Sequence, residues 1–196
     1  MKRLYKYYSM EEIRIAMIKK NMQDIPDIIM PDGYKMRNFV IGEEHKWAKV
    51  ESDSGEFGSG FDKALARFNE EFGDHIDEMQ SVCFFLTDNN NEIIGTATAW
   101  YDNDFMGKKY GRLHWVVILP QYQNKGLGKA MVGHVLKFMA KHHSKAYLYT
   151  ESSRISAIKI YLDFGFEPFI VSENCTEGWK IVAENLQHPK LSEFFG

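Results

Sequence analysis

The chain has 196 residues, of which 44% are hydrophobic and 14% aromatic, a composition typical of one folded globular domain. Its 24 basic and 27 acidic side chains give a formal net charge of −3, so no bulk positive charge attracts nucleic acid or an anionic membrane. No apolar run approaches the ~20 residues that a membrane-spanning helix needs, and Met1–Lys6 lacks the apolar core of a signal peptide. Cys83 and Cys175 fit no metal-ligand spacing, which favours reduced thiols. We therefore expect a soluble cytoplasmic protein that binds no metal, no nucleic acid and no membrane.

The beginning of the chain carries helical patterns. A capping box at Ser9 and Glu12 precedes apolar residues at helical spacing, and it predicts a helix over Ser9–Asn21 that ends before Pro26. The elements that we expect next are a strand over Tyr34–Val40, a short helix from Gly42 through Val50, a flexible connection over Ser52–Gly60 and a helix over Phe61–Phe72. Residues 1–33 are therefore predicted to be a helical extension, and residues 34–196 the main domain.

The rest of the chain alternates strand and helix patterns. Asp88–Asn91 is a strong hairpin turn, and Gly165 stands where a helix-ending glycine is expected. The expected strands are Val82–Thr87, Glu92–Trp100, Leu113–Leu119, Ala146–Thr150, Phe166–Val171 and Trp179–Ala183; the expected helices run from Gly126 to about Lys141 and from Ile155 to Phe164; Tyr101–Gly111 resembles a loop, and the tail with Pro189 has no clear assignment. This order predicts an α/β (α+β) fold with a mixed central sheet of about six to seven strands, flanked by helices.

Residues 119–130 join an apolar strand to an amphipathic helix through a polar turn that contains Gly126 and Gly128. Two glycines at a helix N-terminus leave room for backbone N–H groups to approach a bulky anion such as a diphosphate. The segment matches neither a P-loop, because Ala130 occupies the position of the Ser or Thr, nor a Rossmann fingerprint, because position 131 is Met. A plain strand–turn–helix would use the same glycines for the turn alone.

A second pattern follows about forty residues later, where an Ala-Ile-x-x-Tyr helix ends in Gly165-Phe166. An apolar helix face with a buried tyrosine is another interpretation of this pattern. The Gln123-x-x-Gly126-x-Gly128 spacing resembles the pyrophosphate-binding signature of the GNAT superfamily of acetyl-coenzyme A-dependent N-acetyltransferases, and the Tyr161 helix resembles its other hallmark. The resemblance covers roughly residues 34–183, and it implies the GNAT acyltransferase fold.

The resemblance also implies a reaction: transfer of an acetyl group from acetyl-coenzyme A to a primary amine, by direct attack in a ternary complex. The strand at Val116, Val117 and Ile118 would pair with the pantetheine arm and polarise the thioester carbonyl. The diphosphate would be held by Gln123, Asn124, Lys125, Gly126, Leu127, Gly128 and Lys129. Tyr161 would donate a proton to the coenzyme A sulfur, as a phenol that is protonated at neutral pH can do. Arg154 stands where many members carry Asn; it could reach a phosphate or face the solvent.

The general base stays open between three candidates. His114 lies on the strand where some members of the superfamily carry a catalytic histidine, and imidazole titrates near ~6.5, which suits proton removal. A strand histidine bonded to a backbone carbonyl would look the same. Glu151, at the end of the following strand, and a water relay are the other candidates.

Two further function classes compete with the enzyme. One is a non-catalytic acyl-coenzyme A-binding sensor or regulatory module with the same fold, and the other is modification of a macromolecular amine. The acceptor, a small-molecule or peptide amine, would be chosen by loops at 52–72, 101–110 and 172–178. Tyr101, Asp102, Asp104, Phe105 and Tyr110 could form an aromatic, acidic pocket for a cationic amine, or a solvated loop with a hydrophobic anchor. A homodimer is an expectation from the resemblance alone.

Overall fold

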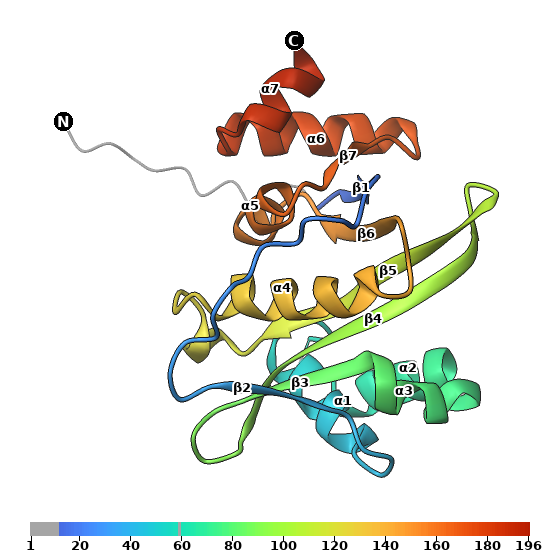
Figure 1. Ribbon diagram of the computed structural model, residues 1–196, viewed down its shortest axis with the longest axis vertical. Helices are drawn as coiled ribbons and strands as arrows, with labels where there is room; N and C mark the ends of the chain where they lie inside the picture. Colours follow the sequence, from blue (N-terminus) through green and yellow to red (C-terminus); the bar gives the residue numbers. More distant parts are fainter. Residues whose placement is uncertain (1–11, 59) are drawn as a thin grey trace. The chain divides into compact units, whose positions relative to one another are not determined.

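The computed structural model describes residues 12–58 and 60–196 (Figure 1). Its contacts divide the chain into two compact units. The larger unit is Lys20–Tyr147, and the smaller one combines Met1–Lys19 with Leu148–Gly196. The division falls within strand β6 (Ala146–Glu151), so that this strand contributes residues to both units. Ser9 of the predicted capping box lies outside the described residues.

The larger unit is built on antiparallel strands. Its elements are β2 (Lys35–Asn38), α1 (Glu44–Asp53), α2 (Phe61–Phe72), the 3₁₀ turn η1 (Gly73–His75), α3 (Ile76–Val82), β3 (Cys83–Thr87), β4 (Ile93–Phe105), β5 (Lys108–Ile118), the 3₁₀ turn η2 (Pro120–Tyr122) and α4 (Leu127–Ala140). The strands lie in the order β2-β3-β4-β5 with antiparallel neighbours, and the first residues of β6 then pair parallel to β5. The sheet is therefore mixed.

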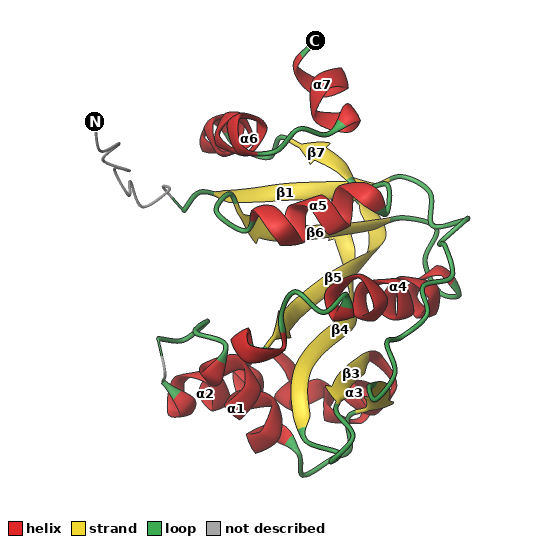
Figure 2. Cartoon of the chain, turned by 90° about the vertical axis from the view of Figure 1, so that its left-hand side faces the viewer, coloured by secondary structure: helices red, strands yellow, loops and turns green. Residues whose placement is uncertain are grey.

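Alternation along β3 places apolar side chains on both faces of this sheet. Phe85 joins a buried aromatic cluster with Trp47 of α1 and Phe68 of α2, whereas the ring of Phe84 contacts Phe138 of α4 at 5.2 Å between centroids. Figure 2 shows the same arrangement, with α1 and α2 on one side of β4 and β5 and with α4 on the other. Both faces are thus covered, as the apolar pattern of β3 requires.

The smaller unit contains the remaining elements. They are β1 (Arg14–Lys19), the later residues of β6, α5 (Ile155–Asp163), β7 (Glu167–Phe169), α6 (Glu173–Asn185) and α7 (Pro189–Phe195). Strand β1 pairs antiparallel with β7, with Ala16 opposite Phe169. Helix α6 packs on β1 so closely that a Cβ on Gly178 would lie 2.6 Å from Cγ2 of Ile15.

Three predicted elements are wrong. The segment Arg14–Lys19 of the predicted helix is strand β1, because its apolar run is buried on both faces, and short apolar runs fit helix and strand equally. Trp179–Ala183 lies in helix α6, where Trp179 and Val182 are buried three residues apart. The Tyr101–Gly111 loop is the continuation of β4 and β5 around a turn at Met106 and Gly107, both of which have positive φ.

Other predictions are confirmed. Helix α2 has the predicted bounds, and the Asp88–Asn91 turn joins β3 to β4. Helix α5 ends at a left-handed Gly165 with φ +84°, where the N–H of Phe166 donates to the carbonyl of Tyr161 at 3.0 Å and that of Gly165 donates to Leu162 at 2.9 Å. The described residues contain seven strands in a mixed arrangement, in agreement with the predicted fold class.

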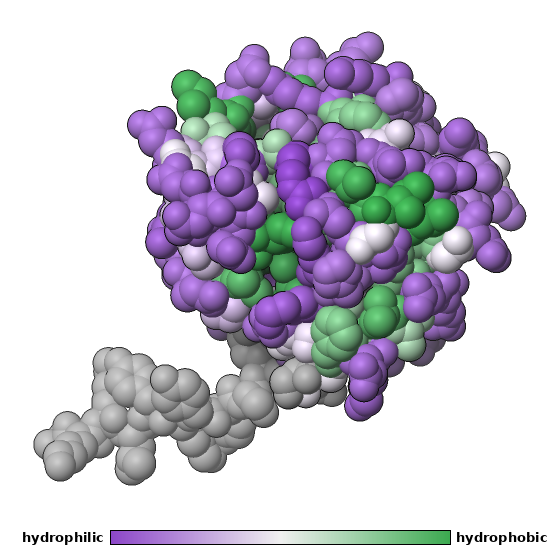
Figure 3. Space-filling view, turned by 90° about the horizontal axis from the view of Figure 1, so that it is seen from below, coloured by the Kyte–Doolittle hydropathy of each residue, from purple (hydrophilic) through white to green (hydrophobic). Residues whose placement is uncertain are grey.

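Both cysteines are free and buried, Cys83 in the larger unit and Cys175 in the smaller one. Burial raises the pKa of the Cys83 thiol to about 12. On the face shown in Figure 3, apolar side chains form separate areas among hydrophilic ones. None of the helices in the described part of the chain is both long and apolar enough to cross a bilayer.

Candidate active site

The turn between β5 and α4 exposes the N-terminus of a 14-residue helix. The side-chain amide of Gln123 donates to the carbonyl of Ile118 at 2.9 Å, which ties the turn to the end of the strand. Asn124 and Gly126 both have left-handed backbones, with φ +61° and +78°. Gly126 is the N-cap of α4, so no cap side chain occupies the first N–H groups of this helix. The turn therefore presents backbone donors and a positive helix end to the solvent.

Strand β5 contains a bulge just before this turn. His114 pairs with Thr98 of β4 and Val117 pairs with Thr96, so two residues of β5 stand opposite one residue of β4. Trp115, inside the bulge, has φ +49°, an uncommon conformation for a residue with a large side chain. The strand is thus irregular at Val116, the first of the three residues that the resemblance predicts to polarise the thioester carbonyl.

The predicted pantetheine strand, residues 116–118, begins within the bulge. Val117 is 7% exposed and packs with Val50 and Leu119. Strand β5 pairs with β6 earlier in its course, Gly111 with Ala146 and Arg112 with Tyr147. Within the described residues of the larger unit, the edge of residues 116–118 that faces away from β4 has no strand partner. A strand edge of this kind can exchange backbone hydrogen bonds with an extended amide chain.

A carboxylate on α2 joins the two residues at the bulge. Nε2 of His114 lies 2.5 Å from Oε1 of Glu71, and Nε1 of Trp115 donates to Oε2 of Glu71 at 2.9 Å. A guanidinium nitrogen of Arg112 lies 3.5 Å from Oε1. Burial alone would raise the pKa of Glu71, but the bonds from His114 and Trp115 and the charge of Arg112 outweigh it and hold this pKa below its usual value.

Glu71 did not emerge from the sequence. It stands 43 residues before His114 on a helix with two other acidic side chains. A helix position that faces a sheet is predicted to be apolar, and Glu71 lies next to the buried Phe72. Glu71 could have been identified as an exception to this rule, because it is an acidic side chain at the edge of an otherwise apolar helix face.

The other predicted site residues belong to the smaller unit. Tyr161 of α5 is 6% exposed, and its ring centroid lies 6.2 Å from that of Phe166. Arg154 is the exposed N-cap of α5, and its backbone N–H donates to the carbonyl of Glu151 at 3.0 Å. The catalytic and binding roles of Tyr161, Arg154 and Glu151 stay predictions.

The aromatic and acidic residues of the predicted acceptor loop lie on the β4–β5 hairpin. The ring of Phe105 stacks on Tyr147 with 3.8 Å between centroids, and the Tyr147 hydroxyl donates to Asp102 at 3.0 Å. The Tyr101 hydroxyl donates to Glu78 at 2.9 Å. These contacts join the β4 arm of the hairpin to Tyr147 and to Glu78 of α3, which agrees with the interpretation as a hydrophobic anchor.

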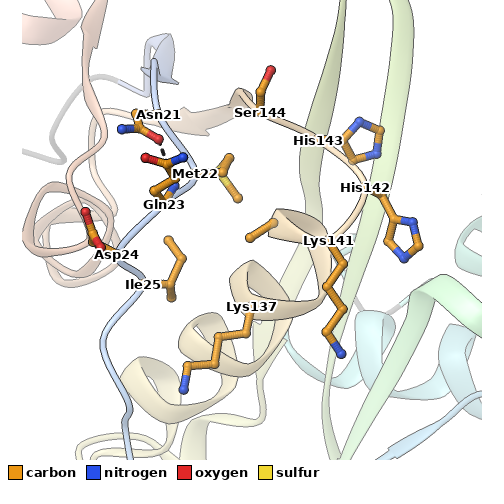
Figure 4. Close-up of a pocket in the computed structure, with 11 residues that line it drawn as sticks. Asn21, Met22, Gln23, Asp24, Ile25, Lys137, Lys141, His142, His143 and Ser144 are labelled. Carbon is orange, nitrogen blue, oxygen red and sulfur yellow. Dashed lines mark hydrogen bonds between the residues drawn. The ribbon is translucent and has the colours of Figure 1, made fainter.

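A cavity of about 630 Å³ lies at the other end of α4 (Figure 4). Its lining consists of Asn21, Met22, Gln23, Asp24, Ile25, Lys137, Ala140, Lys141, His142, His143 and Ser144. None of the predicted site residues lines it, and a helix of this length separates it from Gly126 by about 20 Å. In the described part of the chain, no three His, Cys, Asp or Glu side chains are grouped as metal ligands.

The mixed sheet, the bulged strand β5 and the glycine turn before α4 define the acyltransferase fold that the sequence predicted. The chain belongs to the acetyltransferase (GNAT) family, whose family model matches residues 47–166. That match contains both segments that carry the resemblance, the turn at Gly126 and the helix at Tyr161. The predicted family and its enzyme class are thereby confirmed.

Two curated relatives are mycothiol acetyltransferases. The one from Saccharomonospora viridis is 27% identical over 168 residues, which is 80% of this chain and 53% of the relative. The one from Amycolatopsis mediterranei is 26% identical over 164 residues, with 79% and 53% covered. The chain thus spans about half the length of the curated relatives it matches.

Solved structures share the fold. A GCN5-related N-acetyltransferase from Sphaerobacter thermophilus has a TM-score of 0.63 at 18% identity, covering 81% of this chain and 49% of that one. A GNAT-family acetyltransferase from Colwellia psychrerythraea has a TM-score of 0.61 at 14% identity, with 81% and 53% covered. At such identities the likeness concerns the fold alone.

Proposed function

We propose that this chain transfers an acetyl group from acetyl-coenzyme A to a primary amine. The observation that carries the proposal is the turn at Gly126, where a left-handed glycine caps the N-terminus of α4 next to a bulged strand. The residues present fit the diphosphate of the co-substrate. A Cβ on Gly126 would find its nearest atom 4.0 Å away, so the turn is open, and Lys125 is exposed beside it. Residues 123–129 would hold the diphosphate through backbone N–H groups and lysine charge.

The proposed chemistry is direct transfer of the acetyl group to the amine. The acceptor nitrogen loses a proton and attacks the thioester carbonyl carbon, the carbon–sulfur bond breaks, and the sulfur takes up a proton. Backbone N–H groups on the strand edge at Val116–Ile118 would bind the pantetheine amides and the carbonyl oxygen, where negative charge develops. Holding both reactants in one complex supplies much of the rate.

Two side chains are proposed to move protons. His114 takes the proton from the acceptor amine, and Tyr161 donates one to the departing sulfur. The acceptor is proposed to be a small-molecule or peptide amine, and cytoplasmic location and a homodimer remain predictions. A sensor that binds acyl-coenzyme A without turnover is the competing function.

Calorimetric titration with acetyl-coenzyme A and with coenzyme A, followed by thiol release over a panel of amines, tests the proposal. We expect binding and amine-dependent release. Binding without release on every amine would favour the sensor, and absence of binding would overturn the assignment of the turn.

The Tyr161→Phe variant tests the general acid. Removal of the hydroxyl should lower kcat by about tenfold or more and leave the acetyl-coenzyme A affinity unchanged, because general-acid catalysis contributes ~10²–10⁴-fold. Unchanged kcat at saturating substrates would exclude Tyr161 as the proton donor.

A further inference from the structure

Two consecutive residues of β5 face the same carboxylate. In a regular strand, neighbours such as His114 and Trp115 point to opposite faces of the sheet. The left-handed φ of Trp115, +49°, brings Nε2 of His114 and Nε1 of Trp115 to the same Glu71 carboxylate. A conformation of this kind is unfavourable for a residue with a large side chain and persists only where its surroundings hold it. Here the Trp115 ring is held between Phe57, stacked at 5.6 Å, and Trp47, edge-on at 5.3 Å.

The Glu71 bond also determines which nitrogen of His114 carries the proton. An ionised carboxylate only accepts hydrogen bonds, so the nitrogen that contacts it, Nε2, must be the donor. In the neutral ring the basic nitrogen is then Nδ1. Glu71 is ionised at neutral pH, since its bonds and the charge of Arg112 lower its pKa. An anion at this position also stabilises the imidazolium that forms when Nδ1 takes a proton.

Other ionisable groups belong to the elements packed around this cluster. On β5 itself, Arg112 shares the Glu71 carboxylate. Helix α1 contributes Glu51, which is fully buried, and β3 contributes Cys83, which stands opposite Thr98, the residue paired with His114. Helix α3 contributes Glu78, which bonds to His75 and Tyr101. Of these groups, Glu71 contacts the His114 ring directly, through Nε2.

We propose that Glu71 is a positioning residue for acetyl transfer, which orients His114 with Nε2–H toward the carboxylate so that Nδ1 takes the proton of the attacking amine. The inference rests on the proposed function. In the step, the acceptor N–H bond breaks as the nitrogen bonds to the acetyl carbon, and the proton forms a new N–H bond at Nδ1. The carbon–sulfur bond of the thioester breaks, and the sulfur leaves with its electron pair and takes up a proton. Glu71 stays ionised beside the imidazolium, which later returns the proton to water.

The Glu71→Gln variant, with Glu70→Gln as its matched control, tests the inference. Gln keeps the shape and an acceptor oxygen for Trp115 but removes the charge. Glu70 is exposed on the same helix and pairs with Arg67 at 3.2 Å. We expect kcat/KM of Glu71→Gln to fall at least about tenfold at neutral pH, and the acid limb of its pH profile to move to lower pH. The Glu70→Gln control should match the unmodified protein, and Glu71→Asp, which keeps the charge, should restore part of the loss.

A second readout does not depend on turnover. Nitrogen NMR of the histidine rings, with the His114 signal assigned by its loss in His114→Gln, reports tautomer and titration midpoint. We expect the Nε2–H tautomer in the unmodified protein and a lower midpoint in Glu71→Gln. The same tautomer and midpoint in both would overturn the inference even if the enzyme turns over. If no amine gives thiol release, the proposed function fails, while the NMR result still decides how Glu71 acts on His114.

Discussion

The conformation of Gly126 leads to a prediction that separates folding from ligand binding. Gly126 and Gly42 both have left-handed backbones, with φ +78° and +94°, and both belong to the larger unit. Gly126 caps α4 at the proposed diphosphate site, whereas Gly42 lies in the turn between β2 and α1. Changing each to Ala therefore applies the same backbone perturbation at two places, of which one is proposed to bind acetyl-coenzyme A.

The magnitude follows from the backbone alone. A Cβ on Gly42 would meet no atom within 4 Å, and on Gly126 the nearest atom is Cγ of Pro31 at 4.0 Å, so neither variant introduces a clash. A left-handed residue other than glycine costs about 1–2 kcal/mol, and Ala offsets about 0.4–1 kcal/mol of this by restricting the unfolded chain. Each variant should lose about 1 kcal/mol of unfolding free energy, or about 2–4 °C in Tm.

Thermal unfolding and calorimetric titration check the two effects separately. Both variants should show the same loss of Tm, but only Gly126→Ala should raise the Kd for acetyl-coenzyme A, by tenfold or more, since one hydrogen bond to a charged group contributes about 1.5–3 kcal/mol. Equal Kd values for the two variants would refute the reasoning about the turn. An unchanged Tm for Gly126→Ala would refute the left-handed backbone.

Two other predictions concern stability. Burial raises the pKa of Glu43, but its bidentate bond to Arg37 and its other cationic partner outweigh this and lower the pKa to about 2. Because the folded pKa is depressed, the stabilisation is complete above about pH 5 and is lost toward pH 2; Glu43→Gln should lose about 1–3 kcal/mol at pH 7 and much less at pH 2, unlike the exposed control Asp53→Asn. Gly178→Ala should lose about 1–3 kcal/mol in chemical unfolding, because its Cβ would lie 2.6 Å from Cγ2 of Ile15; unchanged stability would contradict this close approach.

The fold could be predicted where the apolar pattern has one solution. Helix α2 has the predicted bounds because Ala64, Phe68 and Phe72 recur at helical spacing and are buried against one face. The apolar pattern did not distinguish helix from strand where a segment is buried on more than one side. Strand β1 is covered on both faces, and the β4–β5 hairpin is extended by ring stacking between Phe105 and Tyr147, residues 42 positions apart. Such distant contacts leave no periodic trace in a local segment.

The candidate site, like the fold, could be predicted only in part. The turn at Gly126 could be predicted from the sequence, because glycines at the start of a helix indicate a backbone conformation that other residues rarely adopt. The contact between Glu71 and His114 could not be predicted, because nothing in the spacing of Glu71 along the chain relates it to strand β5. The left-handed backbone of Trp115 was equally hidden, since tryptophan is typical of regular strands. Its conformation depends on contacts from α2 and from the loop that carries Phe57.

Each unit of this protein contains one buried thiol, Cys83 in the larger and Cys175 in the smaller. A thiol with a pKa of about 12, as in Cys83, is almost entirely protonated and slow to react while the fold is intact. In the folded protein, a thiol reagent would therefore report released coenzyme A with little background from the chain. The same two cysteines can also report local unfolding. Pulsed alkylation followed by mass spectrometry would measure the opening rate of each unit separately, without any introduced label.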